Sequence, residues 1–207
     1  MKLPTHDLLG LLIATSFAAG LNVYATVATL GVLARTGAIT LPPSLQLLAT
    51  WYVIAAAAVL FAIEFFADKI PAFDLIWNAL HTFIRVPIAA LIAWRATAQL
   101  SAGEQLIAAV AGGLIALAAH SGKTAARAAV TPSPEPLSNT ALSTGEDAAA
   151  IGLTWLATRH PWIAGSLALA AVAILVLMIR WIVRAMHALF RSAERRLVGQ
   201  REPSPTS

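Results

Sequence analysis

Charged residues gather in a few short stretches of a chain that is otherwise apolar. Glu64 and Asp68 are four residues apart, which places both carboxylates on one face of a helix, and Lys69 follows them. More polar residues succeed them at helical spacing: Asp74, His81 and Arg85. These residue types fit a substrate or proton site. They fit equally well a structural ion pair, between Arg85 and Glu64 or Asp68, that locks two helices together.

The second half of the chain carries two more polar stretches. His120, Lys123 and Arg127 recur every three or four residues and form one polar stripe of a helix, and Glu146 and Asp147 precede the tryptophan at position 155. One interpretation is a cytoplasm-facing cavity of mixed charge, in which Lys123 and Arg127, with the arginine at position 85, hold an anionic headgroup. The other is a solvated helix end followed by a loop.

A single amide, Asn22, interrupts the first apolar run. A lone asparagine in a membrane helix most often makes a contact between helices. The alternative is that Asn22 lines a pathway beside a break at Gly20.

The sequence carries no signature of an enzyme. It has no glycine-rich phosphate loop, no nucleophile elbow and no cysteine. The spacing of His81 and His120 predicts no zinc site. We therefore predict no catalytic residue, no metal site and no cofactor.

The composition indicates that these polar residues lie in a membrane. Hydrophobic residues make up 58% of the chain and charged residues only 12%, whereas soluble domains carry roughly 25% charged residues. Alanine and leucine dominate, which favours helices over barrel strands. The predicted fold class is all-α, a polytopic transmembrane helix bundle. Charges inside such spans cost roughly 2.5–3.5 kcal/mol each on insertion scales, so they are the best indicators of function.

A helix needs about 20 residues to cross the hydrocarbon core. We expect six spans within a transmembrane domain over residues 1–198: 8–34, 48–67, 73–98, 104–130, 138–158 and 161–190. Prolines separate several of these segments, and residues 199–207 are expected to be disordered. Three spans in each half would allow a 3+3 inverted repeat. Residues 18–22 and 118–122, each a small polar patch in an apolar helix, are its main support.

The distribution of lysine and arginine orients the six predicted spans. One side receives both termini, three positively charged residues of the connections and the C-terminal arginines at 180, 184, 191, 195, 196 and 201; the other receives Arg35, Arg95 and Arg159. The imbalance predicts a multi-pass protein of the inner (plasma) membrane with both termini in the cytoplasm. The C-terminal arginines are typical of a basic cap on a membrane helix, so no nucleic-acid partner is expected.

Four motifs give the chain a resemblance to a known family. They cover residues 19–24, 64–74 (Glu-Phe-Phe-Ala-Asp-Lys-Ile-Pro-Ala-Phe-Asp), 80–85, and 120–123 together with 143–147. With these motifs the chain resembles a family of small bacterial membrane proteins described as a domain of unknown function. Where that family commonly has a glycine-rich loop before an Asn-Pro pair, residues 132–136 read Pro-Ser-Pro-Glu-Pro. The resemblance implies a membrane fold and no established activity.

Two function classes follow from the sequence. The first is a small transporter or lipid translocator, with membrane lipids around it and an anionic small molecule or lipid headgroup as substrate. The second is a structural membrane protein whose charges only hold helices together. The sequence leaves the oligomeric state open, a homo-oligomer included.

Overall fold

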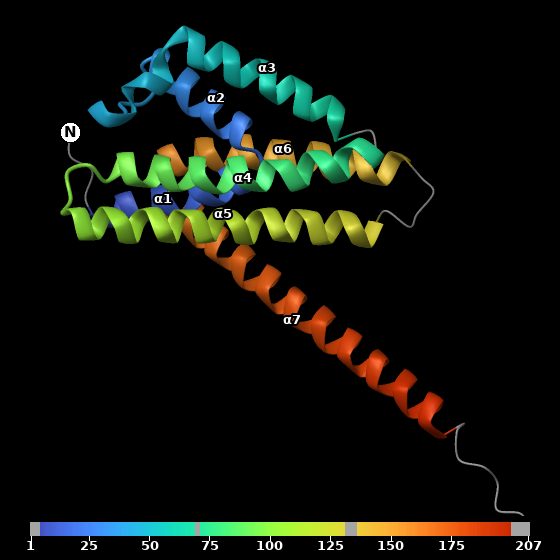
Figure 1. The fold of residues 1–207 in the computed structure, drawn as a ribbon. Helices are drawn as coiled ribbons and strands as arrows, with labels where there is room; N and C mark the ends of the chain where they lie inside the picture. Colours follow the sequence, from blue (N-terminus) through green and yellow to red (C-terminus); the bar gives the residue numbers. More distant parts are fainter. Residues whose placement is uncertain (1–4, 69–70, 131–135, 200–207) are drawn as a thin grey trace, which may run out of the picture.

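The computed structural model describes residues 5–68, 71–130 and 136–199, and this part of the chain is helical without a β-strand. In chain order the elements are α1 (Thr5–Leu21), α2 (Val23–Arg35), the 3-10 helix η1 (Pro43–Ala49), α3 (Trp51–Ala67), α4 (Pro71–Ala96), α5 (Ala102–Val130), α6 (Pro136–Arg159) and α7 (Pro161–Gly199). Figure 1 shows α4 and α5 running side by side, and α1 packs against α4, α5 and α6. The expected all-α fold class is confirmed.

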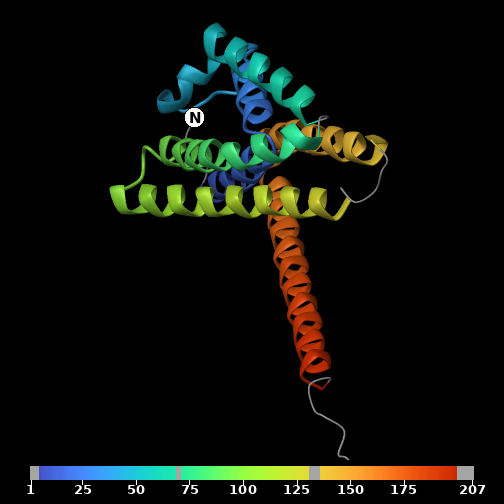
Figure 2. The same cartoon turned by 45° about the vertical axis from the view of Figure 1, so that its right-hand side comes forward.

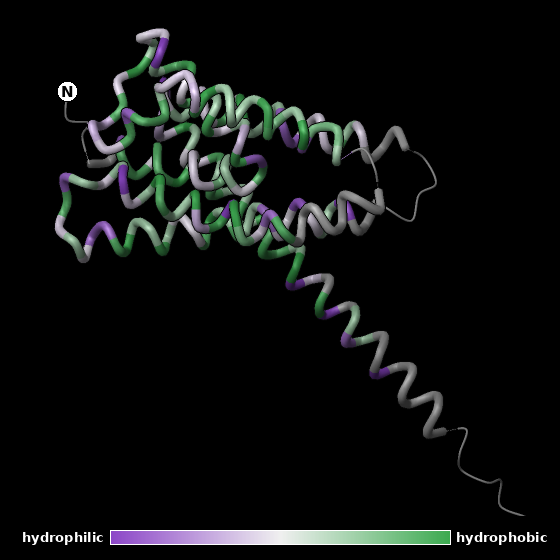
Figure 3. The backbone as a smooth tube through the Cα atoms, turned by 45° about the horizontal axis from the view of Figure 1, so that its top comes forward, coloured by the Kyte–Doolittle hydropathy of each residue, from purple (hydrophilic) through white to green (hydrophobic). Residues whose placement is uncertain are grey.

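Helix length and composition identify a membrane protein. Ala102–Arg127 and Pro161–Ala188 are each long and apolar enough to cross a membrane. A third crossing is formed if Pro43–Ala49 and Trp51–Ala67, which meet at an angle of 61°, count as one bent span. Figure 3 shows hydrophobic residues along most of the helices, with short hydrophilic stretches between them.

The continuous helix expected over residues 8–34 is wrong. Asn22 has an extended backbone, with φ −150° and ψ 104°, so α1 ends before it and α2 begins after it. Its side-chain oxygen accepts a hydrogen bond from the amide of Ala25 at 2.9 Å and caps α2. A short polar side chain that bonds to nearby backbone competes with the helix, which explains the break.

The two helices on either side of this break form a V whose open ends lie at the same end of the bundle (Figure 1). Leu8 and Leu12, near the start of α1, share a buried cluster with Leu41 and Leu45, which follow α2. α1 has 17 residues and is therefore about 25 Å long. The chain thus enters the bundle, turns at Asn22 and returns, so the tip of the V lies inside the protein.

Small residues let α1 pack closely against its neighbours, as is common between membrane helices. α1 contacts α4, α5, α6 and α7. A Cβ atom added at Gly20 would lie 2.4 Å from the backbone oxygen of Ala116 on α5. Ala19 and Ala116 belong to one buried cluster with Ala89 of α4. The position of the tip therefore depends on a close contact between α1 and α5.

Replacing Gly20 with alanine is expected to destabilise the fold by about 1–3 kcal/mol, because the new methyl group meets backbone that cannot rotate away. Thermal unfolding of the detergent-solubilised protein measures this loss. Gly152→Ala on α6 is the matched control, since a Cβ there meets no atom within 4 Å, and it should leave the unfolding temperature unchanged or raise it slightly. Equal melting of both variants would contradict the close contact.

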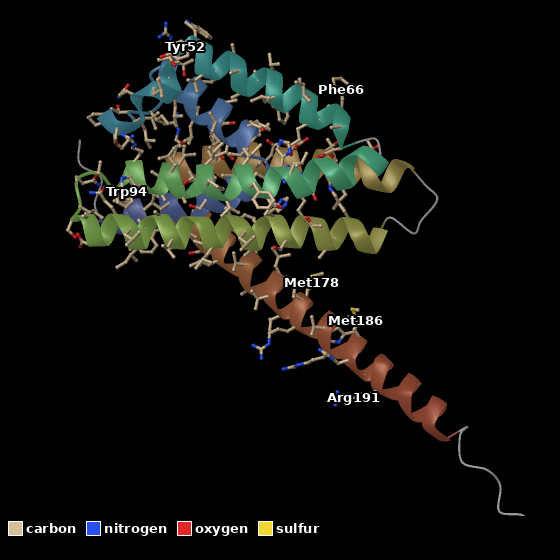
Figure 4. The ribbon with its side chains drawn as sticks, in the orientation of Figure 1. Tyr52, Phe66, Trp94, Met178, Met186 and Arg191 are labelled. Carbon is tan, nitrogen blue, oxygen red and sulfur yellow. The ribbon has the colours of Figure 1, made fainter. Side chains whose placement is uncertain are left out.

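The last helix leaves the bundle obliquely, as the two views in Figures 1 and 2 show. Its first turns pack against α1, where a Cβ at Gly10 would meet the backbone oxygen of Pro161, and further along Leu175 lies against Gly122 of α5. Beyond this point Met178, Met186 and Arg191 project away from the other helices (Figure 4). α7 therefore runs from the end that holds the open V toward the opposite end.

Candidate functional site

Seven ionisable side chains from four helices meet at the tip of the V. They come from the C-terminal end of α3, from α4, from α5 and from α6, and we call them the charge network: Glu64, Asp68, Arg85, Lys123, Arg127, Glu146 and Asp147. None is more than 8% exposed. The helical spacings identified in the sequence bring them together, since residues three or four apart share a helix face. All seven are residues that the sequence predicts for a site.

Arg85 connects α4 with α3 and α5. Its Nη2 pairs with Oε1 of Glu64, so the ion pair expected from the sequence is confirmed. Its Nη1 lies 2.7 Å from Nδ1 of His120. Arginine can only donate, so Nδ1 of His120 must accept and the ring proton lies on Nε2. That proton points to the hydroxyl of Thr82, 2.7 Å away, and the contact holds His120 in its neutral form.

Lys123 lies at the centre of the network. Its Nζ is 3.3 Å from Oδ2 of Asp68, 3.3 Å from Oε2 of Glu146 and 3.5 Å from Oε1 of Glu64. It also donates to the backbone oxygen of Leu21 at 3.3 Å. Leu21 ends α1, where carbonyl groups lack helical partners and carry partial negative charge. One ammonium group therefore serves three carboxylates and the end of the broken helix.

Arg127 joins α5 to α3 and α6. Its Nη2 donates to Oδ2 of Asp68 at 2.6 Å and to Oε2 of Glu146 at 2.7 Å. The hydroxyl of Ser143 on α6 donates to the same oxygen of Asp68 at 3.3 Å. Asp68, which caps the end of α3, thus accepts from two helices at once, and this fixes the end of α3 against the bundle.

Asp147 attaches the network to the tip itself. Its Oδ1 accepts a hydrogen bond from Nδ2 of Asn22 at 2.8 Å, and both residues are buried. Asn22 uses its oxygen to cap α2, so its amide nitrogen is left to face Asp147. The interhelical contact expected for Asn22 is confirmed, whereas the break lies at Asn22 itself and not at Gly20, which is inside α1.

Several contact residues were missed from the predicted set. The hydroxyl of Tyr24, in the first turn of α2, lies 3.0 Å from Nε2 of His81. Thr82 and Ser143 were also missed, although both are buried or half-buried next to predicted residues. Their spacing gives the only available signal, since Thr82 lies three residues before Arg85 and Ser143 three before Glu146. The backbone oxygen of Leu21 carries no signal in the sequence.

Two predicted site residues cannot be placed in this arrangement. Lys69 lies outside the residues that the structure describes, and Asp74 lies in α4 with a side chain outside the described set. His81 is 3% exposed and contacts Tyr24. Among the described side chains no group of three histidine, aspartate or glutamate residues could hold a metal ion.

A cavity of about 280 Å³ lies away from the network, between α1 and α5. Its lining is mostly aliphatic and includes Leu12, Ile107 and Ile115. No residue of the charge network lines it. The residues of the charge network are buried and bound to one another, so they form a closed site. Groups of these types can hold a proton or exchange partners.

The sequence was also compared with known families and proteins. The profile described as "Domain of unknown function (DUF4126)" matches residues 9–182. The chain belongs to the DUF4126 family. The matched range of this DUF4126 chain includes α1 from residue 9 onward, the whole of α2 and the whole charge network, and it ends within α7. No curated protein and no solved structure gave a match to the chain.

Proposed function

We propose that this chain is a small transporter or translocator that carries its substrate past the tip of the V. The observation that supports this most directly is the meeting of a broken helix with buried charges of both signs. Backbone that is not helical is tolerated at membrane depth where it is buried in protein or lines a path. Broken helices whose ends face charged groups are the usual binding sites of secondary transporters.

Energetics support a functional role for the charge network. Burying an ion pair costs about as much desolvation free energy as the pair returns, so apolar residues of equal volume hold helices together as well or better. A bundle that only needed cohesion would not require seven buried ionisable groups. The charges are therefore more useful as groups that change partners.

The substrate class that fits best is a small anion or lipid headgroup with a phosphate or carboxylate. Arg85, Lys123 and Arg127 are the groups that would hold it. In the closed site each already pairs with a carboxylate, so the substrate would displace Glu64 or Glu146. The displaced carboxylate, left without its cation, would take up a proton. Exchange of this kind couples the movement of an anion to the movement of a proton.

The proposed topology has five crossings, by α3 to α7, in place of the six expected. Because the V returns to the end at which it starts, it adds no crossing. The termini then lie on opposite sides. Arg180, Arg184 and Arg191, all exposed at the far end of α7, favour a cytoplasmic C-terminus. An inverted repeat is not part of the proposal, because α1 breaks at Asn22 whereas α5 continues without a break.

The second candidate function is a structural membrane protein. The observation in its favour is the dense pairing of the network, in which Arg85, Lys123 and Arg127 each contact a carboxylate within the chain. In that case the network would stay closed and dry, and no solute would move.

Flux through reconstituted liposomes tests the proposal. Labelled inorganic phosphate serves as the soluble probe, and a fluorescent phospholipid that is quenched from outside serves as the lipid probe. The wild type should move one of the two above protein-free liposomes. Glu146→Gln removes a charge-assisted contact worth about 1.5–3 kcal/mol, so flux should fall about tenfold or more.

Glu104→Gln is the matched control for this measurement. Glu104 is exposed at the start of α5, where it bonds to Ser101 and not to the network. Its flux should equal that of the wild type. If the wild type moves neither probe, or if both variants behave alike, the transport of a phosphate-bearing substrate is refuted and the structural function stands.

A further inference from the structure

The charge network contains one more carboxylate than it has cations. Three cations, Arg85, Lys123 and Arg127, face four carboxylates among the side chains that the structure describes. Three of those carboxylates form ion pairs: Glu64, Asp68 and Glu146. His120 contributes no charge while it accepts from Arg85. Asp147 is the fourth carboxylate, and it forms no ion pair with any described residue.

Among the side chains that the structure describes, those around Asp147 offer no spare positive charge. α6 packs against α1, α2, α5 and α7. From the junction of α1 and α2, Asn22 supplies a neutral donor. From α5 the positive charge of Lys123 acts on Asp147, but this ammonium group already serves three carboxylates. The carboxylates of Glu64 and Asp68 from α3 act on Asp147 as like charges. The side chains of α7 in the hydrophobic cluster shared with α1, α5 and α6 are aliphatic, among them Ala168 and Leu175.

The second carboxylate oxygen of Asp147 completes the argument. Oδ2 is buried and has no hydrogen-bond partner, and the residue as a whole is 4% exposed. A negative charge in that position would lie unpaired in a medium of low dielectric, whereas a neutral hydroxyl without a partner costs much less. With a proton on Oδ2, Oδ1 still accepts from Asn22, and the described network has three positive and three negative charges.

We infer that Asp147 is a proton-binding site that carries a proton at neutral pH and links it to the tip of the V. Asn22 is the only described hydrogen-bond partner of the Asp147 side chain, and it is also the residue between α1 and α2 at which the chain turns. Loss of the proton would place a fourth negative charge beside the tip and strengthen its attraction for Lys123 and Asn22. The binding of the proton follows from the network alone, whereas its use in transport rests on the proposed function.

Infrared spectroscopy of the purified protein at neutral pH tests this site, because a protonated carboxyl group has a carbonyl band separate from that of a carboxylate. The wild type should show the band and Asp147→Asn should lack it. Glu104→Gln is the control. Glu104 is exposed at the start of α5 and bonds to Ser101, outside the charge network, so this variant leaves the charge balance of the network unchanged and should keep the band.

A second variant protects the test in case Asp147→Asn does not fold. Asn22→Ser removes the donor to Oδ1 while keeping a side chain that can cap α2, so the band should shift to higher frequency. A wild type without the band, a band that survives in Asp147→Asn, or a band that does not move in Asn22→Ser overturns the inference. If the wild type shows the infrared band but no flux in liposomes, the proton site stands and the proposed transport function is refuted. If it shows flux but no band, the transport function stands and the proton site is refuted.

Discussion

Arg85→Met is expected to destabilise the folded protein by about 3–5 kcal/mol, the cost of removing one partner of a buried ion pair. Arg85 and Glu64 are both fully buried. Without the guanidinium, the one cation that Glu64 keeps among the described residues is the shared ammonium of Lys123 at 3.5 Å, and His120 loses the donor to its Nδ1. Chemical or thermal unfolding in detergent, followed by helical circular dichroism, measures the loss.

The chain offers a matched control for this substitution on the same helix. Arg95 is exposed near the end of α4, so Arg95→Met should change the free energy of unfolding by no more than about 0.5 kcal/mol. The second substitution Glu64→Gln, added to Arg85→Met, removes the unpaired charge and should restore most of the loss. Equal effects of the two arginine variants, or no rescue, would mean that the pair contributes nothing in the membrane.

Asn22→Leu is expected to destabilise the fold by about 2–4 kcal/mol, because it removes two contacts at once. The N-cap of α2 is worth about 1 kcal/mol. The hydrogen bond to Asp147 leaves a buried acceptor when it is lost, at about 1–3 kcal/mol. Leucine also favours a continuous helix through the turn, against the return of the chain.

Asn22→Ser separates the two contributions. Serine caps a helix nearly as well as asparagine, but its shorter side chain cannot also reach Asp147. This variant should therefore lose about 1 kcal/mol less free energy of unfolding than Asn22→Leu. If the two variants unfold alike, the cap carries no stability and the account of the break at Asn22 is wrong.

Much of the charge network follows from the sequence because helical periodicity is local. The spacing of Glu64 with Asp68, and of His120 with Lys123 and Arg127, fixes a shared face before any tertiary contact forms. The cost of burying each charge then requires these faces to meet. The partner of Arg85 could be narrowed to Glu64 or Asp68 for the same reason, since a helix hairpin brings α3 and α4 together, and the structure selects Glu64.

The V could not be predicted in the same way. Residues 8–34 contain no proline and no charged residue, so hydropathy indicates one long span. The break depends on one asparagine whose oxygen caps α2 and whose nitrogen finds Asp147, 125 positions later in the sequence. That second contact is tertiary, and without it an asparagine in an apolar helix is most often a simple interhelical contact. Lys123 contacts the backbone oxygen of Leu21 only because α1 ends there, so this contact could not be predicted without the break.

Water access to the network tests the central claim most directly, because it needs no knowledge of the substrate. The chain has no cysteine, so a single one can be placed at will. Ser143→Cys puts a thiol of nearly the same size in the network, next to Asp68. Thr154→Cys puts one on the same helix in a position that is equally buried but bonds only to the backbone of Ala150.

A membrane-impermeant thiol reagent is then added to either side of membranes that contain each variant. If the network opens during transport, the thiol at position 143 reacts from at least one side, and the thiol at position 154 stays unmodified from both. If position 143 is as inert as position 154 from both sides, the network is a closed set of ion pairs, and the chain is a structural protein and not a transporter.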